Sequence, residues 1–79
     1  MSTKFEKVEN RQCHGPYSYY KTIEEAKLGC SKDIECTAIY SYACMDEGFN
    51  LCKNGTDSSS SITGSCVYRQ KGKCYLNVM

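Results

Sequence analysis

From Thr22 to Tyr42 the chain reads TIEEAKLGCSKDIECTAIYSY, which has the features of a helix followed by a strand. Thr22 can accept a hydrogen bond from the free backbone N–H groups at the start of a helix, and Glu25 completes a capping box three residues later. We predict a helix over residues 23–31. Its apolar face holds Ile23, Ala26 and Cys30.

The second half of this run favours a strand, because residues 36–42 are rich in β-branched and aromatic side chains. Regular alternation along that strand places Cys36 and Ala38 on one face and Ile39 on the other. A hairpin turn is expected at residues 45–48. Further strands are expected over residues 4–9, 17–20, 49–53 and 66–69.

The chain has 79 residues, of which seven are cysteines. Ordering so short a chain costs about 1.5 kcal/mol per residue, which a small apolar core barely offsets. Disulfides contribute typically about 2–4 kcal/mol each. We therefore predict a single domain over residues 1–79 with three disulfides, one odd cysteine and a secreted or extracellular location, where disulfides persist.

Charge and hydropathy argue against two other classes of protein. A net charge of +1 does not suit a nucleic-acid binder. No apolar run reaches the length of a membrane span, so we expect no membrane insertion. No apolar segment opens the chain, and we expect any secretory leader to have been removed.

The side chains that could carry chemistry have simpler explanations. Structural zinc sites usually contain close ligand pairs such as C-x-x-C, whereas the closest cysteines here, Cys30 and Cys36, are further apart. His14 directly follows Cys13, and this adjacency does not aim a base at a thiol. We expect no enzymatic activity, no metal and no cofactor.

Two features concern the surface of the protein: a glycosylation acceptor and a group of tyrosines. Asn54 opens the N-glycosylation triplet Asn-Gly-Thr within a polar loop expected over residues 54–64. Tyr17, Tyr19 and Tyr20 are candidate ligand contacts, because tyrosine combines a large contact area with a polar tip; core packing is the alternative.

A small basic patch lies near the end of the chain. It consists of Arg69, Lys71 and Lys73. Such a patch either meets sulfated glycans or is a solvated turn.

The run from Thr22 to Ile39 resembles the core of PAN/apple domains, where a helix ends in a cysteine and a second cysteine opens a central strand. Phe49–Cys52 and Ser65–Tyr68 are similar to the following and closing strands, so the resemblance covers about residues 13–69. It implies an α+β fold with a curved antiparallel sheet of about five strands and one helix packed across it. It also implies a non-catalytic extracellular module that binds protein or carbohydrate. Ala26 departs from the family, which usually carries another helix cysteine there.

Six of the seven cysteines are expected to pair. The expected bridges are Cys30–Cys36, Cys44–Cys52 and Cys13–Cys66, with Cys74 as the odd cysteine. The resemblance implies the first bridge, facing positions across the expected turn suggest the second, and the resemblance of the closing strand favours Cys66 over Cys74 in the third. A network with Cys30–Cys52 and Cys36–Cys44 remains an alternative.

These expectations combine into a secreted PAN/apple-like adhesion or recognition module whose partner is a protein or a glycan. The alternative is a free-standing secreted effector, such as a toxin, a pheromone or a protease inhibitor on a disulfide scaffold. Cys74 either joins two copies into a homodimer or remains an inert thiol.

Overall fold

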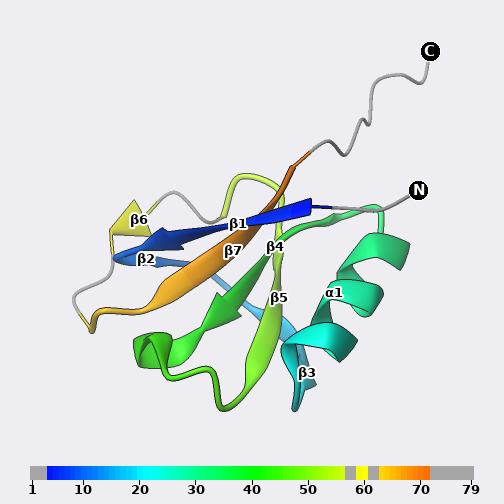
Figure 1. Cartoon of the computed structure of the whole chain (residues 1–79). Coiled ribbons are helices and arrows are strands. Elements are labelled where there is room, and N and C mark those ends of the chain that lie inside the picture. Colours follow the sequence, from blue (N-terminus) through cyan, green and yellow to red (C-terminus); the bar gives the residue numbers. More distant parts are fainter. Residues whose placement is uncertain (1–3, 57–58, 61–62, 72–79) are drawn as a thin grey trace.

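A computed structural model describes residues 4–56, 59–60 and 63–71 (Figure 1). In chain order the elements are β1 Lys4–Glu9, β2 Arg11–Gln12, β3 Tyr17–Tyr20, α1 Ile23–Lys32, β4 Cys36–Ser41, the 3-10 helix η1 Tyr42–Cys44, β5 Phe49–Lys53, β6 Ser59–Ser60 and β7 Cys66–Lys71. Within this described part, no helix combines the length and the apolar character needed to cross a bilayer.

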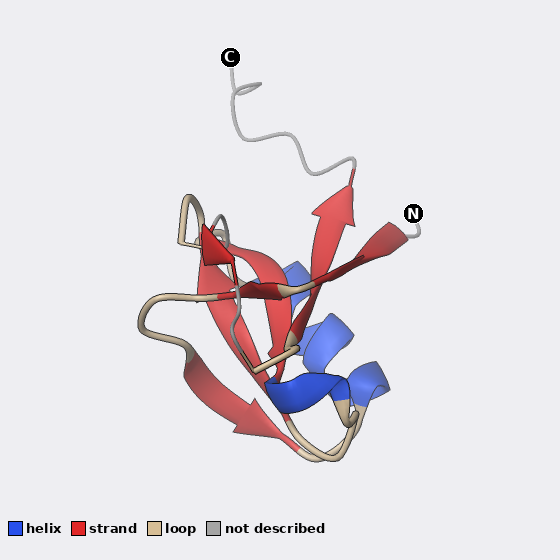
Figure 2. Ribbon diagram, turned by 90° about the vertical axis from the view of Figure 1, so that its left-hand side faces the viewer, coloured by secondary structure: helices blue, strands red, loops and turns tan. Residues whose placement is uncertain are grey.

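Five strands form one antiparallel sheet in the order β1-β7-β4-β5-β3. The strand direction turns between β1 and β5, so the sheet is twisted (Figure 1). After a 90° turn about the vertical axis, α1 lies behind the strands of the sheet (Figure 2). This is the disulfide-stabilised α+β fold that the sequence predicts. The short ribbon of β2 and β6 was not predicted.

The helix begins at the predicted residue. Thr22 Oγ1 accepts the Glu25 backbone N–H at 3.2 Å, which satisfies one of the free donors at the helix start. Ala26 and Cys30 are fully buried, as the predicted apolar face requires. The helix ends at Lys32, and β4 begins at Cys36 after a short connection.

Apolar side chains cover both faces of the sheet. The cluster between the sheet and α1 contains Ala26, Cys30, Cys36, Ile39, Phe49 and Leu51. The cluster on the opposite face contains Cys13, Ala38, Cys52 and Val67, with Val8 and Tyr40 packed against it. Both faces of β4 are therefore buried, which suits its central position.

A β-bulge in β4 changes the face that its first residue occupies. Cys36 pairs with Lys53 and Ala38 pairs with Cys52, so Thr37 is an extra residue relative to β5. Cys36 consequently packs on the side of α1, while Ala38 packs on the opposite side. The prediction that Cys36 and Ala38 share one face is wrong, because simple alternation ignores the bulge.

Cys30, in the last turns of α1, is bonded to Cys36 at the start of β4, with their Cα atoms 5.1 Å apart. This is the bridge that the resemblance implied. The bulge at Thr37 turns Cys36 toward the helix. The Cys30–Cys36 bond therefore fits the register of β4 against β5.

The other two disulfides differ from the expected pairs. Cys13 is bonded to Cys52 and Cys44 to Cys66, with Cα separations of 6.0 Å and 4.9 Å, so the expected Cys44–Cys52 and Cys13–Cys66 pairs are wrong. Cys52 lies on the face of the sheet opposite α1, and Cys13 lies on that same face. Ser41 at the end of β4 pairs with Cys66, which brings the following η1 beside β7 rather than β5.

The alternative network is also absent from the structure. Cys30 and Cys36 lie on the helix side of the sheet, whereas Cys52 lies on the other side, so Cys30–Cys52 cannot form in this fold. Cys74 lies outside the described residues. Its roles as odd cysteine and as dimer link therefore stay predictions.

Candidate functional site

The connection between β4 and β5 has an unusual backbone. Residues 42–48 form this β4–β5 loop, which begins with η1 and takes the place of the tight turn expected at residues 45–48. Ala43, Cys44 and Asp46 have φ angles of 54°, 58° and 57°, in the left-handed region. A non-glycine residue in that region costs about 1–2 kcal/mol, so surrounding groups must hold the loop in this shape.

Buried serines hold the loop from two directions. Ser65 Oγ accepts the Ala43 backbone N–H at 2.9 Å, and Ser41 Oγ accepts the Asp46 backbone N–H at 3.1 Å. Both serines have an exposed fraction of 0 %, so water competes little for these hydrogen bonds. The disulfide at η1 adds a covalent link to β7. The loop is therefore fixed by the sheet beneath it.

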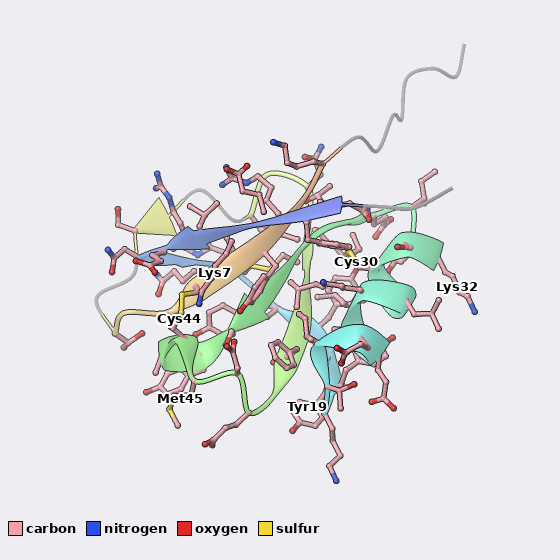
Figure 3. All side chains as sticks on the ribbon, in the orientation of Figure 1. Lys7, Tyr19, Cys30, Lys32, Cys44 and Met45 are labelled. Carbon is pink, nitrogen blue, oxygen red and sulfur yellow. A yellow bond between two sulfur atoms is a disulfide. The ribbon has the colours of Figure 1, made fainter. Side chains whose placement is uncertain are left out.

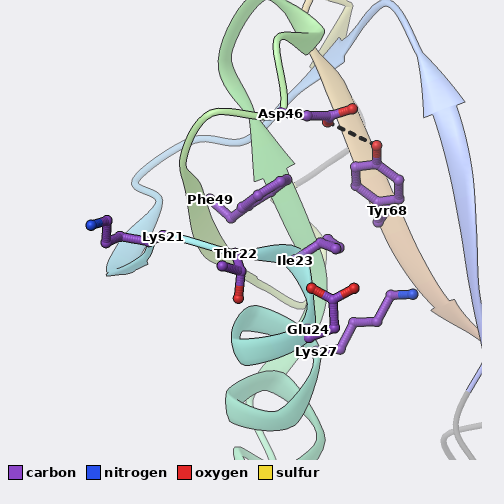
Figure 4. A pocket seen from close by; sticks show the side chains of 8 residues that line it. All are labelled: Lys21, Thr22, Ile23, Glu24, Lys27, Asp46, Phe49 and Tyr68. Carbon is purple, nitrogen blue, oxygen red and sulfur yellow. Dashed lines mark hydrogen bonds between the residues drawn. The ribbon is translucent and has the colours of Figure 1, made fainter.

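The carboxylate of Asp46 makes a further link between the loop and the sheet. Its Oδ1 accepts a hydrogen bond from the Tyr68 hydroxyl at 2.9 Å (Figure 4). It also accepts one from the Ser41 hydroxyl at 3.2 Å. Partial burial and then the bond to Asp46 raise the pKa of Tyr68 to about 12. The phenol therefore keeps its proton, and keeps donating it, at neutral pH.

The outer side of this loop exposes large apolar side chains. Tyr42 and Met45 are 61 % and 53 % exposed, and Tyr19 from β3 is 62 % exposed. We call these three residues the tyrosine–methionine patch; its members Tyr19 and Met45 lie at the same edge of the molecule (Figure 3). They border an open hollow of about 250 Å³. Its lining consists of Tyr19, Tyr42, Met45, Glu47, Gly48 and Asn50.

Gly48 allows Tyr19 to lie against the loop. A Cβ atom at Gly48 would come within 2.7 Å of Tyr19 Cε1 and 2.9 Å of the Tyr19 hydroxyl oxygen. Glycine is the residue that leaves room for the ring in this position. Tyr19 is thus positioned by the loop while most of its surface stays exposed.

A second β-bulge separates the three tyrosines that the sequence grouped as ligand contacts. Tyr17 and Tyr19 pair with consecutive residues of β5, and Ser18 between them is extra, with a φ of 54°. Tyr17 and Tyr20 therefore pack against the cluster beneath α1. Of the three, Tyr19 alone belongs to the tyrosine–methionine patch.

Tyr17 and Tyr20 have structural partners. The Tyr17 hydroxyl donates to Asp33 Oδ2 at 2.6 Å, which joins β3 to the end of α1. Burial and then this hydrogen bond raise the pKa of Tyr17 above its ordinary range. Tyr20 lies against Gly29 of α1. The structure therefore shows core packing for these two tyrosines, while Tyr19 is exposed and stays a candidate contact.

A second hollow, of about 400 Å³, lies on the helix side of the β4–β5 loop (Figure 4). Its lining consists of Lys21, Thr22, Ile23, Glu24, Lys27, Asp46, Phe49 and Tyr68. Two lysines and two carboxylates balance each other, and Asp46 already accepts two hydrogen bonds. This hollow therefore favours no particular ligand charge.

The remaining candidates from the sequence lie elsewhere. Cys13 is in a disulfide and therefore cannot be a nucleophile beside His14. Lys71 of the basic patch lies 3.6 Å from a Glu6 carboxylate oxygen, and Lys73 lies outside the described residues. In the ranges that the structure covers, no three His, Cys, Asp or Glu side chains gather as a metal site would require.

Sequence reasoning did not select Tyr42 and Met45 as candidate contacts. Tyr42 was expected as the last residue of the strand 36–42, and Met45 was expected in a turn. The available signal for a surface contact was Met45, a large apolar residue within an expected polar turn. The arrangement with Tyr19 depends on the bulge at Ser18, which that signal does not reveal.

Comparisons with protein-family models, curated proteins and solved structures find no match to this chain. Its function is therefore inferred from its own residues and their geometry.

Proposed function

We propose that this chain is an extracellular, non-catalytic recognition module of the PAN/apple type, and that it binds a protein partner through the tyrosine–methionine patch. Three disulfides in so short a chain are typical of extracellular folds. One helix on a five-stranded antiparallel sheet, tied at its last turns by Cys30–Cys36, supports the PAN/apple assignment.

The single observation that carries the binding proposal is the β4–β5 loop. Three left-handed residues are held there by buried serines and a disulfide, yet Tyr42 and Met45 point outward. A simple connection between two antiparallel strands needs no such strain. A loop held in one shape loses little conformational freedom when it binds, so it suits a preformed contact surface.

The composition of the patch indicates what it would contact. Tyrosine and methionine are enriched in the centres of protein interfaces, where they fill apolar pockets. Glu47 lines the same hollow and adds one negative charge at its border. The partner therefore presents an apolar side chain next to a basic group, which complements both features.

A carbohydrate is the second candidate ligand. Tyr19 and Tyr42 are both more than half exposed, and amphipathic aromatic side chains suit contact with a sugar. Asn50 lines the hollow as well, but its side-chain amide already donates to the Ser18 carbonyl at 2.9 Å. The polar groups left for a sugar are therefore few, which favours the protein ligand.

The test applies the folded domain, assembled into a multivalent soluble probe, to arrays of extracellular proteins and of glycans. We expect binding to proteins that is lost in Tyr42→Ser with Met45→Ser. Gly48→Ala should also weaken binding, because the added Cβ displaces Tyr19.

The matched control is Ile34→Ser, which removes another exposed apolar side chain, 73 % exposed, outside the patch. Ligands that bind wild type and Ile34→Ser equally, and fail to bind the patch variants, support the proposal. Ligands that keep binding when Tyr42 and Met45 are both serine contradict it. Binding to the glycan array alone would replace the protein partner by the carbohydrate.

A further inference from the structure

We propose that Asn54 carries an N-linked glycan and that this glycan covers Ile34. Asn54 directly follows β5, at the end of that strand opposite the β4–β5 loop. Asn54 and Gly55 are exposed and form the turn that follows β5. The triplet Asn54-Gly55-Thr56 is the acceptor sequence for this modification. The three disulfides suit passage through the oxidising compartment where the modification takes place.

The turn can carry the sugar without losing its own hydrogen bonds. The Asn54 backbone N–H donates to the Glu35 carbonyl at 3.2 Å, and the Thr56 backbone N–H and hydroxyl donate to the Lys53 carbonyl at 3.1 Å and 2.7 Å. The His14 backbone N–H donates to the Thr56 carbonyl at 3.0 Å. These contacts use backbone groups and the threonine hydroxyl, so a substituent on Asn54 Nδ2 breaks none of them.

The chemistry is a transfer from a lipid-linked oligosaccharide pyrophosphate. Asn54 Nδ2 gives up one proton and forms a bond to the anomeric carbon of the first sugar. The bond between that carbon and the donor's pyrophosphate oxygen breaks, and the lipid pyrophosphate leaves with the electron pair. The product keeps a neutral amide and gains a bulky, solvated group.

The neighbourhood of Asn54 gives the glycan a surface to cover. The hydrogen bond to the Glu35 carbonyl and the 3.4 Å ion pair between Lys53 and Glu35 place this turn beside the segment that leads into β4. Ile34 directly precedes Glu35 in this segment. At 73 %, it is the most exposed of the large apolar side chains in the described chain. Sugars that begin at Asn54 can therefore shield Ile34 from water.

The same position keeps the glycan away from the β4–β5 loop, which carries Tyr42 and Met45 of the tyrosine–methionine patch. The β4–β5 loop precedes β5 and Asn54 follows it, so the five residues of β5 separate them (Figure 1). At about 3.4 Å per residue, that separation is about 17 Å along the strand. Glycosylation at Asn54 would leave the opposite end of the domain free, independently of what binds there.

The experiment secretes the chain behind a cleavable leader from an animal-cell host. Wild type and Thr56→Ser, which keeps the acceptor triplet, should both carry a glycan on the Asn54 peptide, detected by intact mass and removed by peptide-N-glycosidase. Asn54→Gln should have the mass of the bare chain. Secreted, disulfide-bonded protein in which wild type and Thr56→Ser are both unmodified at Asn54 would overturn the proposal.

The shielding of Ile34 is tested separately by retention on a hydrophobic-interaction column. Glycosylated wild type should elute before Asn54→Gln, and the difference should shrink by at least half when both carry Ile34→Ser. An unchanged difference would show that the glycan does not cover Ile34 and would overturn that half of the proposal. Neither result depends on whether the tyrosine–methionine patch binds a ligand.

Discussion

Ser65 Oγ accepts the backbone N–H of Ala43 at 2.9 Å, across 22 positions of sequence. Ser65 is fully buried, and Ala43 has a φ of 54°. The hydroxyl of Ser65 also lies 3.3 Å from the Tyr40 hydroxyl and 2.8 Å from the Thr63 hydroxyl. One small polar side chain therefore connects the left-handed start of the β4–β5 loop to the segment before β7.

Replacing Ser65 by alanine should destabilise the domain by about 1–3 kcal/mol, because it leaves the part-buried Ala43 backbone N–H without its acceptor. The measurement is the free energy of unfolding from urea titration with the disulfides intact. Ser60→Ala, at an exposed position in β6, is the matched control and should change little. Equal midpoints for the two variants would mean that Ser65 does not hold the loop.

Replacing Thr22 by alanine should cost about 1 kcal/mol of stability, because the helix loses the acceptor for the Glu25 N–H. Thr22→Ser keeps the hydroxyl and should retain most of that stability. Thermal unfolding followed by circular dichroism compares the three proteins. If the alanine and serine variants unfold alike, the cap does not contribute.

Replacing Gly29 by alanine should fail to stabilise α1, although alanine is favoured over glycine by about 1 kcal/mol inside a helix. The added Cβ would overlap the Tyr20 hydroxyl, and it would lie 2.6 Å from Tyr20 Cζ. Once Tyr20 is replaced by alanine, the same Gly29→Ala change should be stabilising. Urea titration of all four members of this double-mutant cycle tests the contact, and equal increments in both backgrounds would contradict it.

The domain should lose stability as pH rises from 10 to about 12, because the pKa of Tyr68 is raised from 10.0 to about 12 by burial and by its bond to Asp46. In that window the unfolded chain releases the phenol proton while the folded chain keeps it, so alkaline pH favours unfolding. The stabilising contribution is complete below pH 10. Tyr68→Phe should show a smaller loss over the same pH range in urea titrations. A pH dependence identical to wild type would contradict the raised pKa.

Digestion should identify the disulfides directly. Trypsin followed by cyanogen bromide, which cuts after Met45, separates the peptide with Cys44 from the peptide with Cys52. We expect peptide 12–21 bonded to peptide 46–53, and peptide 33–45 bonded to both 28–32 and 54–69. Seven cysteines less six bonded ones leave Cys74, so the monomeric chain should have one alkylatable thiol. A linkage between peptides 12–21 and 54–69 would restore the Cys13–Cys66 pairing and overturn this one.

Local sequence signals predicted most of the secondary structure. The cap at Thr22 and the apolar face of Ala26 and Cys30 located α1, because both depend on residues within two helical turns. The strand predicted over residues 49–53 has those bounds in the structure, and the one predicted over residues 36–42 ends at Ser41. These elements follow from composition and spacing that a short window contains.

Two of the three disulfide pairs and the candidate site could not be predicted in this way, because they depend on which strands lie side by side and in which register. One extra residue at Thr37 sends Cys36 toward α1, and one at Ser18 sends Tyr19 away from Tyr17 and Tyr20. A shift of one residue exchanges the faces of every side chain beyond it. Neither Thr37 nor Ser18 carries a local signal for a bulge. Simple alternation therefore placed Cys36 and Ala38 on one face, and the three tyrosines were grouped by their nearness in sequence.

The pairing of the two long disulfides also decides what a protease can do to this domain. Cys13–Cys52 and Cys44–Cys66 enclose segments that overlap, so every peptide bond between Cys13 and Cys66 lies inside at least one closed covalent ring. A single cut anywhere in this span, including the exposed turn after β5, opens a ring and releases no fragment. The cleaved chain would remain one covalent molecule until its disulfides were reduced, and only then would it separate into two fragments.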